Sequence, residues 1–154
     1  MKINIYTDGS SSLKTGNASW AFAVLDEHQN IIHQNAEYVK GGYIGRMELT
    51  ALTKAVEYVD QLNYSFDEIH FYSDSQYVIN SINKKWIQGW HERLWMNVKN
   101  ADIWKEFYLV FKNMPKHVFF HHIKGHQKDE VSVHAKWNNY VDQMCYIMAT
   151  GRER

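Results

Sequence analysis

The sequence is poor in cysteine and proline. Its one cysteine, Cys145, excludes an intramolecular disulfide framework and a Cys-x-x-Cys metal site, and it favours a reducing compartment such as the cytoplasm. One proline and eight glycines among 154 residues argue against a disordered chain or a linker-rich array. These absences leave a folded globular protein as the expectation.

Long apolar runs are missing as well. The first six residues hold no apolar stretch of a secretory signal, and no run approaches the roughly 18 apolar residues of a membrane span. We therefore expect a cytoplasmic protein without membrane contact. With 45% hydrophobic and 22% charged residues, the length fits one domain over residues 1–154. No feature calls for an obligatory protein partner, so we expect a monomer.

The net charge of zero conceals an uneven distribution. Residues 1–83 carry ten acidic and five basic side chains, whereas residues 84–128 carry three acidic and nine basic ones. Such asymmetry suits a polyanionic partner on the basic segment, although a solvated surface with uneven charges is the alternative. The basic segment also holds four tryptophans: Trp86, Trp90, Trp95 and Trp104. These suit either base stacking or, more ordinarily, a local core.

The hydrophobic periodicity predicts an alternation of strands and helices. Strands are expected at residues 2–8, 18–25, 31–39, 68–73 and 117–123. Helices are expected from about Arg46 to Gln61, through Tyr77 to Ile82, in two pieces over residues 86–114, and along an apolar stripe from Trp137 to Met148. The first three strands read as an antiparallel meander, and the overall order predicts an α/β sheet with helices on its faces.

Two carboxylates follow predicted strands at turns, Asp8 after the first and Asp74 after the fourth. Glu48 shares the core-facing side of its helix, in the first turn, and Asp142 lies beside the apolar stripe of the last helix. If the first and fourth strands are parallel neighbours, the two aspartates meet at a switch point of the sheet, where ligands bind. Each acid alone has an ordinary structural explanation. Crowded together they would repel one another, and Mg²⁺ would remove that cost.

Several ordered blocks that include these acids resemble ribonuclease H type 1, over nearly the whole chain. The blocks with acids are Tyr6-Thr7-Asp8-Gly9-Ser10, Gly45-Arg46-Met47-Glu48-Leu49-Thr50-Ala51, Tyr72-Ser73-Asp74-Ser75-Gln76-Tyr77-Val78 and Asn138-Asn139-Tyr140-Val141-Asp142. The others are Trp86–Trp90, Val98–Trp104 and Ile123–His126. The resemblance implies a ribonuclease H-like fold: a five-stranded mixed sheet with three antiparallel strands, two further strands parallel to the first, and helices on both faces.

The resemblance also implies a metal-dependent endonuclease that cuts the RNA strand of an RNA/DNA hybrid and leaves 5′-phosphate and 3′-hydroxyl ends. Its catalytic, metal-binding carboxylates would be Asp8, Glu48, Asp74 and Asp142. In the family, two Mg²⁺ ions flank the scissile phosphate, and Mn²⁺ usually replaces them. Asp8 would bridge both ions, with Asp142 completing the water-side site. Glu48 and Asp74 would complete the leaving-group site.

His126 resembles the mobile loop histidine of the family, which assists proton transfer or product departure. An unperturbed histidine titrates at about pH 6.5, so it exchanges protons at working pH. The same region is crowded with histidines: His117, His121, His122, His126 and His134. Strand or loop surface is the ordinary interpretation of most of them, and a zinc cluster without cysteines is the less favoured one.

Contacts to the hybrid are expected along the loop after the first strand and along a basic protrusion over residues 84–105. The resemblance and these positions together give the substrate-binding candidates Ser10, Asn17, Arg46, Gln76, Lys84, Lys85, Arg93, Lys99 and Asn138. Tyr43-Ile44-Gly45 replaces the polar residues that the family places before Arg46, which predicts weaker hybrid binding. The protrusion also carries His91-Glu92 where lysines are common, and the loop from His126 to Asp142 is longer than usual.

Two other functions fit the same acids. One is a DNA nuclease of the same fold, such as a resolvase or an integrase core, and the other is a non-catalytic hybrid-binding module. Retention of all four acids argues against the binding module, because a binder gains nothing from carboxylates that repel one another.

Overall fold

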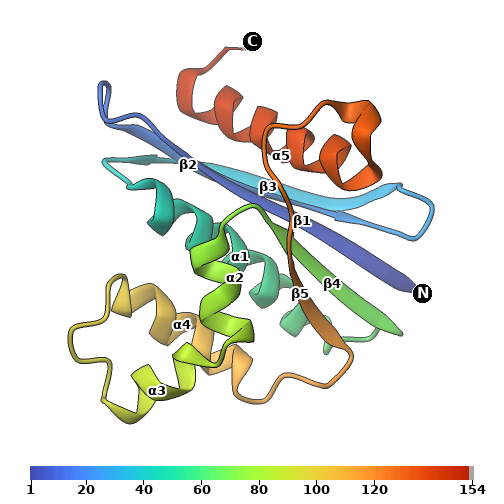
Figure 1. The fold of residues 1–154 in the computed structure, drawn as a ribbon. Helices are drawn as coiled ribbons and strands as arrows, with labels where there is room; N and C mark the ends of the chain where they lie inside the picture. The colour runs from blue at the N-terminus through green and yellow to red at the C-terminus, as the bar shows by residue number, and fades with distance from the viewer. Residues whose placement is uncertain (153–154) are drawn as a thin grey trace.

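The computed structural model describes residues 1–152, in which five strands form a mixed sheet (Figure 1). The strands are β1 (Lys2–Ser11), β2 (Asn17–Leu25), β3 (Ile31–Lys40), β4 (Glu68–Ser73) and β5 (Val118–His122). They lie in the order β3-β2-β1-β4-β5. β1, β2 and β3 pair antiparallel, while β1 with β4 and β4 with β5 pair parallel. The predicted mixed sheet is confirmed.

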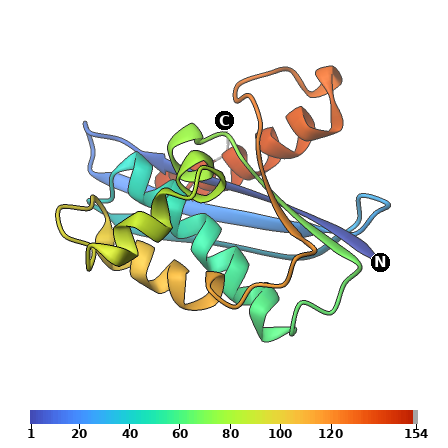
Figure 2. The same cartoon turned by 60° about the horizontal axis from the view of Figure 1, so that its bottom comes forward.

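Helices cover both faces of the sheet, as expected. They are α1 (Ile44–Gln61), α2 (Gln76–Asn83), α3 (Trp86–Glu92), α4 (Ala101–Phe111) and α5 (Val133–Thr150), with a short 3₁₀ turn, η1 (Asp129–Val131), before the last. Figures 1 and 2 show α1 to α4 on one face and α5 on the other. α4 ends three residues before the expected end near Met114. None of the helices within residues 1–152 combines the length and the apolar character that a membrane crossing requires.

The side chains of β1 alternate between two cores. Ile3 and Ile5 are fully buried on the side of α1, in an apolar cluster that includes Leu52. Tyr6 points to the opposite face, into a smaller cluster with Trp137 of α5. Each fully buried aliphatic side chain contributes about 1.5–3 kcal/mol to folding. The central strand is therefore held firmly between two helical layers.

β1 does not end at Asp8, as the turn-like sequence after it suggested. Its pairing with β4 stops at Tyr6, which is opposite Tyr72. Its pairing with β2 continues to Ser11, opposite Ala18. Asp8 therefore lies inside a strand, at the point where only one neighbouring strand remains bonded.

Two details of the helices also differ from expectation. α1 begins at Ile44 rather than near Arg46, because the Tyr43 carbonyl already accepts a hydrogen bond from the Met47 N–H at 2.9 Å. Glu48 consequently lies in the second turn, not the first. In α5 the predicted stripe is largely buried, but Met148, near the end of the helix, is 38% exposed.

Candidate active site

A cavity of about 390 Å³ opens where β1 and β4 stop pairing. All four acids predicted from the sequence line this cavity. Its lining residues are Asp8, Gly9, Ser10, Ser11, Ile44, Glu48, Asp74, Gly125, His126 and Asp142. They come from β1, α1, α5, the β4–α2 connection and the segment after β5, so chain segments far apart in the sequence meet here.

Three carboxylates lie together at the centre of the site. Within residues 1–152, Asp8, Glu48 and Asp74 form the one group of three or more potential metal ligands, with one oxygen from each lying within 4.8 Å of the others. Asp8 is 5% exposed, whereas Glu48 and Asp74 are half-buried. An all-oxygen donor set of this kind suits Mg²⁺ or Mn²⁺ rather than a softer ion.

Gly9 allows β1 to approach α1 closely enough to bring Asp8 and Glu48 together. A Cβ atom on Gly9 would lie 2.5 Å from the Met47 carbonyl carbon and 2.7 Å from the Met47 Cβ. A side chain therefore does not fit between the strand and the helix. The glycine after Asp8, which reads as a turn signal in the sequence, instead serves this close contact.

Asp74 is fixed from two further sides. A Cβ on Gly125 would lie 2.7 Å from the Asp74 Oδ2 atom, so the chain after β5 passes directly over this carboxylate. The Asn138 side-chain amide donates a hydrogen bond of 3.4 Å to the same oxygen. Asn138 is 3% exposed, and its Oδ1 atom is buried without a hydrogen-bond partner within residues 1–152. Asn138 therefore contacts Asp74 from inside the protein, and its predicted role in substrate binding stays a prediction.

The crowding raises the pKa values of the acids. Burial, and then the charges of Asp74 and Asp142, raise the pKa of Asp8 well above its ordinary value. Burial, and then the charge of Asp74, raise the pKa of Glu48 to about 7. Without a cation, the site therefore holds protons at a pH where isolated carboxylates are ionised.

The raised pKa of Glu48 makes the stability of the metal-free protein depend on pH. Because the pKa of Glu48 in the folded state exceeds the ordinary value of 4.5, protonation of this side chain stabilises the folded protein. This stabilisation is fully present below about pH 4.5 and is lost as the pH rises to about 7. In EDTA at about pH 8, we expect Glu48→Gln to exceed wild type in free energy of unfolding by about 2 kcal/mol, and by much less at about pH 5. Chemical denaturation at both pH values measures this difference.

The exposed acid Glu92 provides a control, since Glu92→Gln removes one charge without touching the cavity. Added Mg²⁺ should stabilise the wild type more at the higher pH, where the ligands are already deprotonated. A difference between Glu48→Gln and wild type that stays constant across the pH range would contradict the raised pKa.

Asp142 and His126 line the same cavity as the three central acids. Asp142 is close enough for its charge to raise the pKa of Asp8. His126 lies in the segment after β5, with a left-handed φ of 57°. The structure thus brings all five residues expected to be catalytic to one cavity, and their roles stay predictions.

The substrate-binding candidates are divided by the structure. Ser10 lines the cavity, and the exposed Gln76 begins α2. Asn17 belongs to β2, not to a loop, and its Oδ1 accepts a hydrogen bond from Tyr38.

Arg46 donates two hydrogen bonds to Asp102 of α4, at 2.9 and 2.5 Å. That ion pair joins α1 to the protrusion. The remaining basic candidates, which are all exposed, are Lys84, Lys85, Arg93 and Lys99.

The tryptophans of the protrusion mainly form its core. Trp104 is fully buried, and the half-buried Trp90 packs edge-on against it at 5.5 Å between ring centroids. Trp95 is also half-buried and packs on the same apolar cluster. Trp86 differs, because it is exposed and the Lys84 ammonium lies 5.8 Å from its ring centre. The core interpretation is therefore confirmed for three of the four tryptophans.

Sequence reasoning assigned no catalytic or binding role to three residues of the cavity, Ser11, Ile44 and Gly125. Gly125 had one usable signal, since it directly precedes His126 in a block that resembles the family. Ile44 stood in the Tyr43-Ile44-Gly45 segment, which the sequence marked only as lacking the polar residues expected there. Ser11 carried no signal, because a serine does not point to chemistry by itself. The places of Ser11 and Ile44 follow from the extension of β1 and the early start of α1.

Comparison with known proteins agrees with this geometry. The RNase H family model matches residues 1–148. A ribonuclease H of Syntrophomonas wolfei is 36% identical over 151 residues, which cover 94% of this chain and 93% of that protein. A ribonuclease H of Chlorobium phaeobacteroides is 32% identical over 150 residues, covering 94% and 92%. The solution structure of the prototype foamy virus RNase H domain has a TM-score of 0.79 at 23% identity, covering 96% of this chain and 93% of that domain. By sequence and by fold, this chain belongs to the RNase H family.

Proposed function

We propose that the protein cleaves the RNA strand of RNA/DNA hybrids by metal-dependent hydrolysis. The observation that carries this proposal is the convergence of Asp8, Glu48 and Asp74 within 4.8 Å, in a cavity that Asp142 and His126 also line. Nothing in ordinary folding favours such crowding, because the buried acids raise one another's pKa. A carboxylate cluster that is electrostatically unfavourable alone, and whose repulsion bound cations remove, is typical of metal-assisted catalysis.

Two Mg²⁺ ions, for which Mn²⁺ can substitute, are the cofactors that fit this donor set. When bound, they supply a water of lowered pKa and positive charge at the departing oxygen. Asp8 would be a ligand of both ions. Asp142 would complete the site of the ion that activates the attacking water, and Glu48 and Asp74 would complete the site of the ion beside the departing 3′ oxygen. The products would carry a 5′-phosphate and a 3′-hydroxyl.

The rest of the chain positions these groups and the substrate. His126 exchanges the proton of the attacking water or assists product departure, because it lies on the cavity wall. Ser10 and Gln76 contact the nucleic-acid backbone beside the cavity. The exposed cations of the protrusion bind phosphates of the DNA strand through salt-sensitive contacts: Lys84, Lys85, Arg93 and Lys99. The chain acts as one domain and as a monomer in the cytoplasm.

The proposal is tested by offering the purified protein an RNA/DNA hybrid, duplex RNA and duplex DNA of one sequence, each with Mg²⁺ or with EDTA. We expect cleavage of the RNA strand of the hybrid, in Mg²⁺ only, because the minor-groove shape and the 2′-hydroxyls distinguish it from the duplexes. End-labelled products should carry 5′-phosphates. Cleavage of duplex DNA would instead indicate a DNA nuclease of this fold, and hybrid binding without cleavage would indicate a binding module.

A further inference from the structure

The face of the sheet that carries α5 also carries a histidine pair outside the cavity. α5 packs mainly on β1, β2 and β3. Beside it, on the same face, the side chains of β4 and β5 form a stacked group with ring centroids about 5.0 Å apart: His70, Tyr72, Phe119 and His121. Phe119 is 41% exposed. Solvent therefore reaches this part of the sheet.

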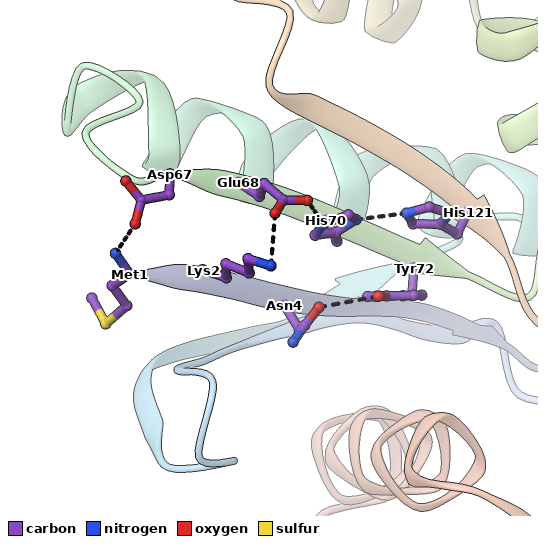
Figure 3. Close-up of polar contacts among 8 residues, drawn as sticks. All are labelled: Met1, Lys2, Asn4, Asp67, Glu68, His70, Tyr72 and His121. Carbon is purple, nitrogen blue, oxygen red and sulfur yellow. Dashed lines mark hydrogen bonds and ion pairs between the residues drawn. The ribbon is translucent and has the colours of Figure 1, made fainter.

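His70 of β4 and His121 of β5 are diagonal neighbours across the two strands (Figure 3). In the strand register, His70 lies opposite Phe119, and His121 lies opposite Tyr72. The His70 Nδ1 atom lies 2.8 Å from the His121 Nε2 atom. The other ring nitrogen of His70, Nε2, lies 3.2 Å from the Glu68 Oε1 atom. The second oxygen of Glu68 pairs with Lys2 at 2.9 Å. The result is a carboxylate–imidazole–imidazole series along the sheet surface.

Glu68 determines which nitrogen of His70 carries the proton. A carboxylate only accepts hydrogen bonds, so His70 Nε2 must donate, and a neutral His70 then presents an unprotonated Nδ1 to His121. A carboxylate bound to the far nitrogen of an imidazole is the arrangement that orients metal-binding histidines and makes them more basic. A metal ion between the two rings would take the place of the proton that they now share.

We propose that His70 and His121 form a second metal site, for a divalent transition ion of tetragonal geometry such as Ni²⁺ or Cu²⁺. Two nitrogens bound at about 2.0–2.1 Å lie about 2.9 Å apart at a right angle, and about 3.4 Å apart at a tetrahedral angle. The observed separation of 2.8 Å is close to the first value. The rings must turn so that both lone pairs point at one ion, and the terminal torsion of histidine is soft. Water completes the coordination.

The chemistry of this site differs from that of the catalytic cavity. Imidazole nitrogens favour ions late in the first transition series, whereas the carboxylate cluster favours Mg²⁺. The two sites should therefore bind different ions from the same solution.

The site is tested by titrating Ni²⁺ into the whole protein by calorimetry, in excess Mg²⁺ to occupy the carboxylates. We expect one equivalent of Ni²⁺ to bind. His70→Gln and His121→Gln should each weaken binding at least about tenfold, because each removes one of two nitrogen ligands. A glutamine at position 121 still offers an N–H toward His70, which preserves the fold. His28→Gln, in an exposed turn, should bind like wild type, and so should Asp8→Asn, which damages only the carboxylate cluster.

The role of Glu68 is tested with a matched pair of variants. Glu68→Gln should weaken Ni²⁺ binding by about tenfold or more, as loss of an outer carboxylate does at other histidine sites. Lys2→Gln breaks the Lys2–Glu68 ion pair but leaves Glu68 beside His70, so binding should not weaken. Equal losses in the two variants would mean that the surface ion pair, not the histidine contact, matters.

A spectroscopic measurement on the unmodified protein makes the test independent of the variants. With one equivalent of Cu²⁺ in excess Mg²⁺, electron paramagnetic resonance should show an axial spectrum with coupling to two imidazole nitrogens. An oxygen-only spectrum would overturn the proposal, as would Ni²⁺ affinity that both histidine variants leave unchanged. Either result would leave the proposal of hybrid cleavage standing, because the two sites share no residue.

Discussion

Asp8→Asn should reduce cleavage of an RNA/DNA hybrid at least about 10³-fold, because a metal site contributes several kcal/mol of transition-state stabilisation and each 1.36 kcal/mol is tenfold in rate. Asp8 is the most buried of the clustered acids and the one that the other carboxylates surround. Asparagine has nearly the same shape, and its Oδ1 still accepts the Gly9 N–H hydrogen bond, which measures 2.9 Å in the native protein. The loss of turnover should therefore come without loss of structure.

The metal-free stability of this variant should change in the opposite direction from its activity. Removing the Asp8 charge relieves repulsion from Asp74 and Asp142, so the melting temperature in EDTA should stay equal or rise, and Mg²⁺ should no longer raise it. Asp26→Asn, in the surface turn between β2 and β3, serves as the control and should retain wild-type turnover. Full activity of Asp8→Asn with an unchanged melting curve would remove Asp8 from the catalytic site.

Local sequence patterns were sufficient for the elements, but not for their exact contacts. Alternation located all five strands because strand side chains repeat with a period of two. It could not show that β1 continues beyond the point where its pairing with β4 ends. A strand that still pairs with a neighbour on its other side keeps the same alternation of side chains there. Asp8 therefore looked like a turn residue, although it lies within a strand.

The main feature of the site that the sequence did not predict was the set of contacts between residues far apart along the chain. The acids were found because charged residues stand out against apolar patterns and match family blocks. The Arg46–Asp102 ion pair and the hydrogen bond from Asn138 to Asp74 were missed because each joins residues far apart in the sequence, which local patterns cannot pair. His70 was missed for the same reason, since its partner His121 is adjacent only through the register of β4 and β5.

Gly9→Ala should damage stability and catalysis together. Its Cβ would press on backbone and Cβ atoms of Met47 at 2.5 to 2.7 Å, and a helix backbone cannot turn aside as a flexible side chain can. Overpacking of this kind costs about 1–3 kcal/mol in free energy of unfolding. The helix must also move away from β1, which separates Glu48 from Asp8. A shift of about 1 Å at a catalytic group costs on the order of 10²-fold in rate.

Two other glycines separate these effects. Gly45 lies in α1, the helix that Gly9 contacts, and a Cβ at this position meets nothing within 4 Å. Gly45→Ala should therefore raise the free energy of unfolding by up to about 1 kcal/mol through helix propensity and leave turnover unchanged. Gly125→Ala meets the Asp74 carboxylate, which can rotate, so it should lower turnover more than stability. Denaturation curves and hybrid cleavage rates for the three variants test this order. If Gly9→Ala matched Gly45→Ala in both measurements, the close approach of β1 and α1 would not be what assembles the site.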